Sequence, residues 1–376
     1  MKPVKVLKPI RFGLIGTGHV AHYCVEEINR HPDGVVVAAC ARNAERLATF
    51  CKDFAIERSY PSATALFEDD EIDAVYIALP THLHASLAIQ ALEAGKHVVL
   101  EKPFAMNVAE AEAVVAAADA SGRVCMLGMN QRFVEDHQKI RSLVQRGVLG
   151  DIYHAKAVWL RRAGIPKLGT WFGHKTLAGH GSLYDIGVHM LDLCLYTMNN
   201  FEPISVSGVT YTKFGNRGLG EGGWGYSENE GLVFDVDDFA SAFIRFANGA
   251  TVTLDVAWAC HQGDDQPPNV TLYGTEGGAT LNPAALFRND AEGGNDDKNE
   301  GGNENKNNDE NKEGALVDTL SHEVEFSHCS RFANFINHLQ GKEALCVTAQ
   351  QALVVQTILD GIAQSAATGR EVRLQP

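Results

Sequence analysis

Residues 10–22 read IRFGLIGTGHVAH, and this stretch predicts how the first third of the chain folds. An apolar, strand-like run ends at a G-x-G-x-x-A spacing, and a helix-like pattern follows it. Glycines at such a turn let the backbone approach a pyrophosphate, and the helix N-terminus offers it free N–H groups. The alternative is a glycine turn that only packs the helix on the strand. The dinucleotide contacts that we expect are Gly16, Thr17, Gly18, His19 and Val20.

The alternation of strand and helix continues beyond this turn. Apolar, strand-like runs recur at 35–41, 74–80, 97–103 and 124–130. Amphipathic helical stretches separate them at 19–31, 43–54, 85–95 and 108–122. Strands that alternate with helices of this length form βαβ units, and near-continuous apolar strands are typical of a sheet covered on both faces. We predict an α/β Rossmann domain with a doubly wound parallel sheet in residues 1–129.

The pattern changes in the second part of the chain, residues 130–376. Apolar and polar residues alternate, with the period of half-buried antiparallel strands, at 151–162, 204–215, 239–249 and 250–260. Helix-like segments occur at 185–198, 330–340 and 349–366. We therefore predict that a second domain, of the α+β class, follows the first.

Residues 290–314 (DAEGGNDDKNEGGNENKNNDENKEG) contain almost nothing that a core can bury. Nine acidic residues against three lysines give this segment a charge of −6 (3 − 9), out of a formal −15 for the chain. Low hydrophobicity with many Gly, Asn and charged residues indicates a surface insertion. A flap or a contact within an oligomer is the functional alternative.

Composition argues against several classes of protein. The 376 residues are 45% hydrophobic and 21% charged, which suits a globular protein with two cores. An acidic chain without a basic patch is a poor partner for nucleic acid. No run is apolar enough for a membrane span or a signal peptide. The eight cysteines are scattered without a CxxC pair, so we expect reduced thiols and a cytoplasmic protein.

The end of the second strand bears on the choice of cofactor. An acidic residue there would bind the ribose diol of NAD, whereas an arginine can accept the 2′-phosphate of NADP. The sequence has Ala41, Arg42 and Asn43 at this place, with no acid. We expect Ala41 and Arg42 to contact the cofactor, with NADP favoured over NAD. The alternative is that Arg42 is simply exposed at a strand end.

The third strand ends in Pro80-Thr81-His82-Leu83-His84. This loop lies at the carboxyl end of the predicted sheet, where open α/β sheets bind ligands. We expect Pro80, Thr81 and His84 to contact the cofactor. Thr81 could instead cap the next helix, and the histidines could face solvent.

Two short motifs place ionisable residues where chemistry is possible. In HVVLEKP (97–103) a buried strand stops at Glu101 and Lys102, although lysine is rarely buried without a partner. In DIGVH (185–189) Asp185 and His189 are four residues apart, which puts them on one face of a helix. A solvated ion pair, a helix cap and a packing histidine are the structural alternatives.

Together, GTGHVA, PTHLHA, AGKHVVLEKP and GHGSLYDIGVHMLD resemble the glucose–fructose oxidoreductase/inositol dehydrogenase/MocA (Gfo/Idh/MocA) family over nearly the whole chain. The resemblance implies a Rossmann domain followed by an α+β domain with an open, mostly antiparallel sheet. It also implies that substrate binds between that sheet and the nicotinamide. Members are commonly dimers or tetramers joined through the sheet, so a homo-oligomer is expected.

The resemblance assigns roles to particular residues. It implies that Lys102 lies beside the nicotinamide and the reacting hydroxyl, where an ammonium stabilises developing negative charge, and that Glu101 helps to position the loop. Glu101 and Lys102 are both expected to contact the cofactor. His189 becomes the general acid/base, and Asp185 bonds substrate and supports the pair. Asp192, on the same helix, is a weaker candidate.

Further substrate contacts are expected near these motifs. Where many relatives have a run of glycines, this chain has Gly179-His180-Gly181-Ser182, which makes His180 a candidate. The histidine-rich patch lacks a zinc signature, so no metal is expected. The complete set of expected substrate contacts is Lys102, Arg162, Trp171, His180, Asp185 and His189, with Arg161 and Lys175 as additional candidates.

The predicted function is an NAD(P)-dependent oxidoreductase that moves a hydride between nicotinamide and a secondary hydroxyl of a sugar, glycoside or cyclitol. For a pyranose, C3 is weakly favoured. A glycoside-cleaving enzyme that retains NAD and uses transient oxidation is one alternative. A non-catalytic dinucleotide sensor is another, although a sensor has no need of Lys102, Asp185 and His189.

Overall fold

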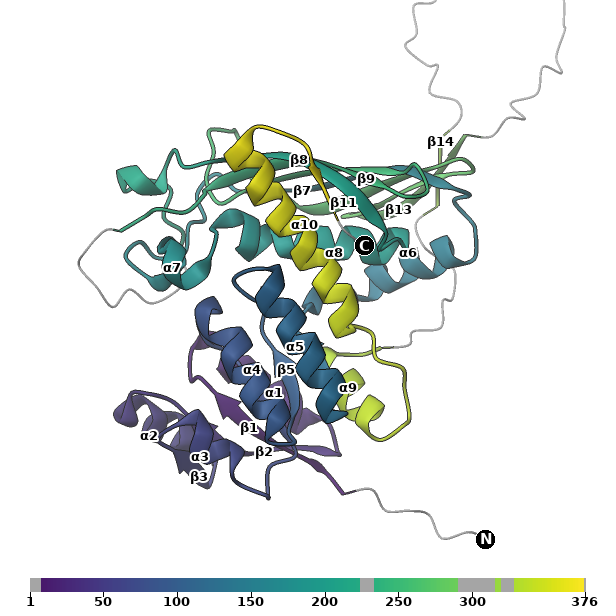
Figure 1. Ribbon diagram of the computed structural model, residues 1–376. Coiled ribbons are helices and arrows are strands. Elements are labelled where there is room, and N and C mark those ends of the chain that lie inside the picture. The colour runs from purple at the N-terminus through teal and green to yellow at the C-terminus, as the bar shows by residue number, and fades with distance from the viewer. Residues whose placement is uncertain (1–7, 224–232, 290–314, 319–327, 375–376) are drawn as a thin grey trace, which may run out of the picture.

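The computed structural model describes residues 8–223, 233–289, 315–318 and 328–374. It contains a six-stranded sheet in the N-terminal part and a nine-stranded sheet in the C-terminal part, with helices between and around them (Figure 1). The predicted acidic insertion, 290–314, lies outside the described residues.

The first sheet is parallel throughout, with the order β3-β2-β1-β4-β5-β6. Its strands are β1 (Ile10–Ile15), β2 (Gly34–Cys40), β3 (Arg58–Tyr60), β4 (Ala74–Ile77), β5 (His97–Leu100) and β6 (Cys125–Leu127). The predicted doubly wound sheet is therefore confirmed. The strand order reverses between β1 and β4, and ligands of such sheets bind outside the carboxyl ends of the strands at this switch point.

The helices of this part are α1 (His19–Arg30), α2 (Ala44–Asp53), α3 (Ala63–Phe67), α4 (His84–Glu93) and α5 (Val108–Ser121). Asn43 and Asn107 cap α2 and α5, because each side chain accepts a backbone N–H of the first turn. Gly122 ends α5 in the left-handed conformation (φ 64°). Helix α1 has no side-chain cap, so its first N–H groups remain available.

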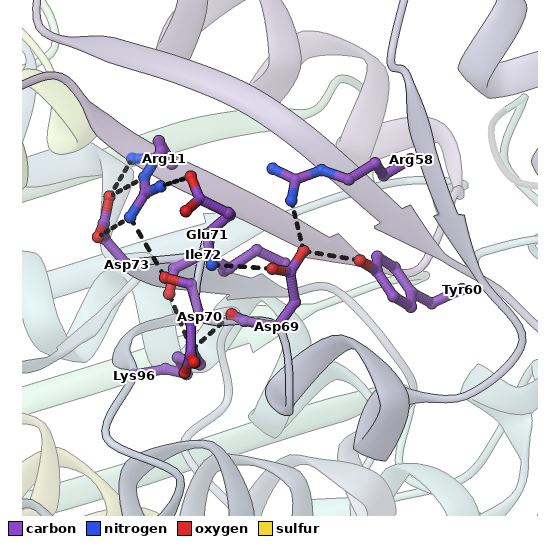
Figure 2. A network of polar contacts seen from close by, with 9 residues as sticks. All are labelled: Arg11, Arg58, Tyr60, Asp69, Asp70, Glu71, Ile72, Asp73 and Lys96. Carbon is purple, nitrogen blue, oxygen red and sulfur yellow. Dashed lines mark hydrogen bonds and ion pairs between the residues drawn. The ribbon is translucent and has the colours of Figure 1, made fainter.

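A polar network ties the amino ends of β1, β4 and β5 at the edge opposite the switch point (Figure 2). Arg11 holds the carboxylate of Asp73, with Nε to Oδ2 at 2.8 Å. The ammonium of buried Lys96 donates to the carbonyl oxygens of Asp69 and Ile72, at 2.8 and 2.9 Å. These contacts fix the loop that leads into β4.

The second sheet has the order β14-β13-β12-β11-β7-β10-β9-β8-β15, and only the β7–β10 pair is parallel. The mostly antiparallel sheet that the resemblance implied is thus confirmed. Its strands are β7 (Ile152–Leu160), β8 (Pro203–Tyr211), β9 (Phe239–Phe246), β10 (Thr251–Ala257), β11 (Gln266–Gly274), β12 (Gly278–Leu281), β13 (Ala284–Asn289), β14 (Ala315–Asp318) and β15 (Val372–Arg373).

Helices pack on one face of this sheet, and no helix within the described residues packs on the other (Figure 1). The packed helices are α6 (Glu135–Gln145), α8 (Val188–Met198) and α10 (Ala349–Thr368), while the short helix α7 (Lys175–Ala178) lies beside residues 81–83 of the first part. Along β9, Ala240, Ala242 and Ile244 are buried on the covered side, whereas Phe239 and Phe243 remain partly exposed. No helix within the described ranges has both the length and the apolar character of a membrane span.

Helix α9 (Arg331–Leu339) returns from the second half of the chain to the first sheet. The ring of Phe332 lies 6.1 Å from that of Phe12 on β1 and 5.4 Å from that of Tyr76 on β4, between ring centroids. Phe335 lies 6.0 Å from Phe12. A segment within the predicted second domain therefore completes the core of the first one.

Candidate functional site

The turn between β1 and α1 has the shape that a dinucleotide requires. Gly16 has φ +104°, and a Cβ there would lie 2.3 Å from the carbonyl oxygen of Ala78. Gly18 has open space around the position of its missing Cβ, at the uncapped start of α1. Thr17 is partly exposed, and His19 and Val20 are exposed beside it. These features suit a pyrophosphate bound by backbone N–H groups.

The segment after β2 is open to solvent. Ala41 is partly exposed, and Arg42 is exposed between the strand and α2. Asn43 is engaged in capping α2. A bound adenosine ribose would therefore meet a guanidinium and no carboxylate in this segment.

The loop after β4 corrects one expectation. Pro80 is partly exposed, but Thr81 and His84 are each only 1% exposed. Both ring nitrogens of His84 lie 2.8 Å from backbone carbonyl oxygens, those of Pro103 and Leu79. Burial lowers the pKa of this histidine. His84 thus braces the loop against the segment that follows Lys102, and its ring does not face a cofactor.

Lys102, which follows the carboxyl end of β5, joins the first sheet to the segment that leads into α8. Its ammonium donates to Asp185, at 2.7 Å to Oδ1 and 2.9 Å to the backbone oxygen. The Lys102 side chain is 19% exposed and that of Asp185 is 8% exposed. The pair is thus shielded, which strengthens it relative to a surface ion pair.

Asp185 lies on a π-helical turn, Leu183–Gly187, directly before α8. Such wide turns are frequent at functional sites. Its second carboxylate oxygen accepts the indole N–H of Trp258 at 2.8 Å. Burial alone would raise the pKa of Asp185, but Lys102 and Trp258 outweigh it, so the pKa is lowered and the carboxylate stays ionised.

Trp258 is a site residue that the sequence analysis missed. It follows β10 and is fully buried, so it reads as an ordinary core aromatic. An indole also carries an N–H that needs a partner when it is buried. A tryptophan at the end of a predicted strand could therefore have been recognised as a donor that needs a polar partner.

His189 lies one turn further along, in α8. Burial first, and then the charge of Lys102, lower its pKa to about 3, so the imidazole is neutral. Its Nδ1 is buried without a hydrogen-bond partner among the described residues. The His189 ring lies 6.5 Å from that of Trp159, and the Arg161 guanidinium stacks 4.3 Å from the Trp159 ring. An aromatic face and a guanidinium therefore adjoin the histidine.

Glu101 occupies a different place from the one expected. It is buried, and its Oε1 accepts the hydroxyl of Tyr76 and a guanidinium N–H of Arg331, both at 2.7 Å. With these partners the carboxylate is enclosed behind the Lys102 loop. Its Oε2 accepts the backbone N–H of Lys102 at 3.3 Å, so these contacts favour the expected support of the loop over a direct contact with the cofactor.

The other expected substrate contacts are less central. Arg162 is exposed, and its backbone N–H donates to Oδ1 of Asp265. Trp171 stacks on Phe172 at 3.9 Å, and His180 Nδ1 lies 3.4 Å from a carboxylate oxygen of Asp237. Within the described part of the chain, no hydrogen bond or ring contact joins Arg162, Trp171 or His180 to the catalytic candidates.

Asp192, the weaker candidate on the same helix, has a structural role. Both of its carboxylate oxygens bond the guanidinium of Arg132, at 2.6 and 2.9 Å, and both side chains are essentially inaccessible. No cluster of three His, Cys, Asp or Glu side chains suited to a metal occurs in the ranges that the structure describes.

Comparison with known proteins agrees with this geometry. Residues 10–129 match the family described as "Oxidoreductase family, NAD-binding Rossmann fold". Residues 137–280 match the "GFO/IDH/MocA C-terminal domain". The two matches together cover more than half of the chain.

One named relative spans the full length of the chain, and others match part of it. The chain is 30% identical to D-glucoside 3-dehydrogenase of Escherichia coli over 383 residues, which cover 100% of each protein. It is 32% identical over 249 residues to levoglucosan dehydrogenase of Pseudarthrobacter phenanthrenivorans, covering 64% and 63% of the two proteins. A levoglucosan dehydrogenase structure in complex with NADH superposes with a TM-score of 0.78 at 23% identity, covering 98% and 100% of the chains, which shows a shared fold. The chain therefore belongs to the Gfo/Idh/MocA family of oxidoreductases.

Proposed function

We propose that this protein oxidises a secondary hydroxyl of a sugar or glycoside, with C3 of a pyranoside as the preferred position. The observation that carries the proposal is the shielded Lys102–Asp185 pair beside His189, at the sheet edge that bears the dinucleotide turn. The name of the full-length relative, a D-glucoside 3-dehydrogenase, supports the choice of substrate and position.

The Lys102 ammonium is the group that stabilises charge on the substrate oxygen. An ammonium has three N–H donors, and two of them bond Asp185. The third can donate to the alcohol oxygen, which becomes more negative as the C–H bond breaks. Since Asp185 remains ionised, its carboxylate holds the Lys102 side chain in the site through the 2.7 Å contact.

His189 receives the hydroxyl proton. Its imidazole is neutral because burial and the charge of Lys102 lower its pKa, so a nitrogen lone pair can accept the proton. A bound nicotinamide supplies the acceptor for the hydride that leaves the alcohol carbon, and the product is the ketone. In the reductive direction His189 returns the proton to the ketone oxygen.

Trp159 and Arg161 are proposed to hold the sugar ring. An indole offers a flat apolar surface to the C–H face of a pyranose, and a guanidinium offers several donors to its hydroxyls. Burial lowers the pKa of Arg161, and its only side-chain hydrogen bond among the described residues is a long one, 3.4 Å to the carbonyl of Gly164. Most of its donors are therefore available to substrate.

NADP is proposed as the preferred cofactor. The support is local: Arg42 is exposed beside the expected ribose position, and residues 41–43 include no acid. A comparison of R42A with the unmodified protein tests this. We expect the KM for NADP to rise about tenfold, with the KM for NAD little changed. A protein that uses NAD better than NADP before any substitution would overturn the preference.

The function is tested by incubating purified protein with NAD or NADP and a panel of glucosides, free sugars and cyclitols. We expect reduced nicotinamide to form with a glucoside, and a C3 ketone to be found by NMR. K102M should lower kcat by about 100-fold or more, whereas K139M, which removes a lysine paired only with surface acids, should not. Release of free sugar without net cofactor reduction would instead establish a glycoside-cleaving enzyme.

A further inference from the structure

Arg331, the first residue of α9, carries a buried guanidinium directly behind the loop of Lys102. Its Nη1 donates to Glu101 Oε1 at 2.7 Å, and its Nη2 lies 3.0 Å from the sulfur of Cys24. Its Nε reaches Glu27 Oε2 at 3.5 Å. The side chain thus links α9 to α1 and to the end of β5.

Glu101 connects this guanidinium to the catalytic lysine. Its Oε2 accepts the backbone N–H of Lys102 at 3.3 Å, and its Oε1 also accepts the hydroxyl of Tyr76 at 2.7 Å. Burial alone would raise the pKa of Glu101, but the charge of Arg331 outweighs it and lowers the pKa. The carboxylate is therefore ionised, and its charge is balanced from behind the loop.

We propose that Arg331 is a positioning residue, which acts through Glu101 to hold Lys102 in reach of Asp185. The inference rests on the proposed function in so far as Lys102 is the charge-stabilising group. It assigns a part in the reaction to a helix more than 200 residues away along the chain, for which the family motifs give no signal.

The mechanism is a competition between two carboxylates for one ammonium. Glu101 and Asp185 both interact with Lys102, but only Asp185 now bonds its ammonium. Without Arg331, Glu101 would be a buried carboxylate that lacks its main countercharge, which is costly. Two responses lower that cost: the carboxylate takes up a proton, or the Lys102 ammonium turns towards it and leaves Asp185.

This competition predicts a new pH dependence. Removing Arg331 raises the pKa of Glu101 towards neutrality, so kcat should be higher at low pH, where Glu101 is protonated, and should fall as Glu101 ionises and attracts Lys102. Several titratable or charged groups on neighbouring elements interact with Glu101: Cys24 of α1, Tyr76 of β4, His84 of α4, Lys102, His189 of α8 and Arg331 of α9. Glu27 of α1 interacts with Arg331.

The test compares R331M with the double variant R331M/E101Q, measuring kcat and KM for sugar and cofactor between pH 5 and 9. In R331M we expect kcat at pH 8 to fall about 10- to 100-fold, with the KM for cofactor within about twofold. In R331M/E101Q the competing charge is gone. We expect kcat to recover to within about fivefold of the unmodified protein, and the new pH dependence to vanish.

Two further variants separate positioning from general stability. K342M removes an exposed ion pair, Lys342 to Asp33 at 2.9 Å, that also joins the end of α9 to the first sheet but does not touch Glu101. We expect its kcat and pH profile to be unchanged. R331K keeps the positive charge. It should retain most of the activity, and its kcat should show no new dependence on pH.

The inference is overturned if R331M keeps kcat within twofold and an unaltered pH profile, or if R331K is impaired as much as R331M. Should R331M fail to fold, E101Q is compared with R331M/E101Q. Equal kcat values support action through Glu101, and a further large loss contradicts it. A failure of the proposed function would be seen separately, as an unmodified protein that oxidises none of the sugars.

Discussion

Trp258 shows how a single hydrogen bond can support the catalytic cluster. Its indole N–H is the only partner of Asp185 Oδ2 among the described residues, while Lys102 holds the other oxygen. In W258F that oxygen would stay buried without a donor. Because a hydrogen bond to a charged group contributes about 1.5–3 kcal/mol, we expect kcat to fall about 10-fold or more. Steady-state kinetics measures this change, with the KM for cofactor as the internal control. An unchanged kcat would show that Trp258 does not support catalysis.

The lowered pKa of His189 predicts how the rate of oxidation depends on pH. The acid limb of kcat/KM reports the pKa of the free enzyme's base. Since the pKa of His189 is lowered to about 3, kcat/KM for oxidation should show no loss from this group as the pH falls from 8 to 5. An ordinary histidine would give a limb near pH 6.5. The profile should be taken where circular dichroism shows the protein to be folded, and a limb between pH 6 and 7 would contradict the burial of the ring.

Residue patterns and resemblance led to some parts of the site and not to others. The spacing of Gly16 and Gly18 pointed to the turn that the structure forms, because a tight turn restricts local sequence. Trp258 and Arg331 were missed, because each acts through a contact with a distant segment. His84 and Glu101 were expected to contact the cofactor, but their side chains bond protein groups, since a polar residue at a strand end looks the same whether it faces the cleft or the core.

At the scale of the element, periodicity identified most of the long helices and strands, but it missed α6 and β11, of 11 and 9 residues, as well as the shortest elements. Strand β3 is three residues long and reads Arg-Ser-Tyr, with no apolar run to mark it. Helix α3, of five residues, is equally hidden. The π-helical turn at Leu183–Gly187 was read as part of a helix, because the extra residue of a wide turn leaves no mark on the apolar pattern.

The network of Figure 2 should stabilise the first sheet without affecting catalysis. Lys96 is 5% exposed and bonds two carbonyl oxygens of the loop before β4. K96M would leave those oxygens without a donor, although it also removes the cost of burying a charge. We expect the free energy of unfolding to fall by about 1–3 kcal/mol, measured by denaturant titration.

The same variant has a clear expectation for activity. The network lies at the amino ends of the strands, and the dinucleotide turn lies at the carboxyl ends, so kcat should be unchanged at a temperature where K96M is folded. K139M is the matched control for stability: its lysine pairs with exposed acids and should cost about 0.5 kcal/mol or less. A loss of activity in folded K96M would show that the two edges are coupled.

For the whole molecule, the open face of the nine-stranded sheet predicts self-association. Partly exposed aromatic rings lie along it, and basic side chains stack on two of them, Arg245 on Phe243 and Lys156 on Tyr273. A face of this kind is typical of an interface. We expect the 40.7 kDa chain to form dimers or tetramers through it, which size-exclusion chromatography with light scattering will measure.

A substitution at the centre of that face tests the prediction. Thr253 of β10 is flanked by Phe243 on β9 and Lys156 on β7. In T253E the new carboxylate can pair with Lys156 in a monomer, but it would be desolvated within an interface. We expect the mass measured by light scattering to fall to that of one chain. The T253E monomer should still unfold in a cooperative thermal transition. An unchanged mass would place the interface elsewhere.

Helix α9 also constrains how the protein is made. Phe12 and Tyr76 belong to strands that leave the ribosome early, yet the rings that cover them, Phe332 and Phe335, come near the end of the chain. At the usual 5–20 residues per second, the last strand of the first sheet precedes α9 by about 10–40 s of synthesis. Throughout that interval the nascent Rossmann sheet exposes an apolar surface that its own later sequence must cover. If translation stalls before residue 331, this apolar surface of the sheet stays exposed. We expect chaperones and proteases to bind such a truncated chain.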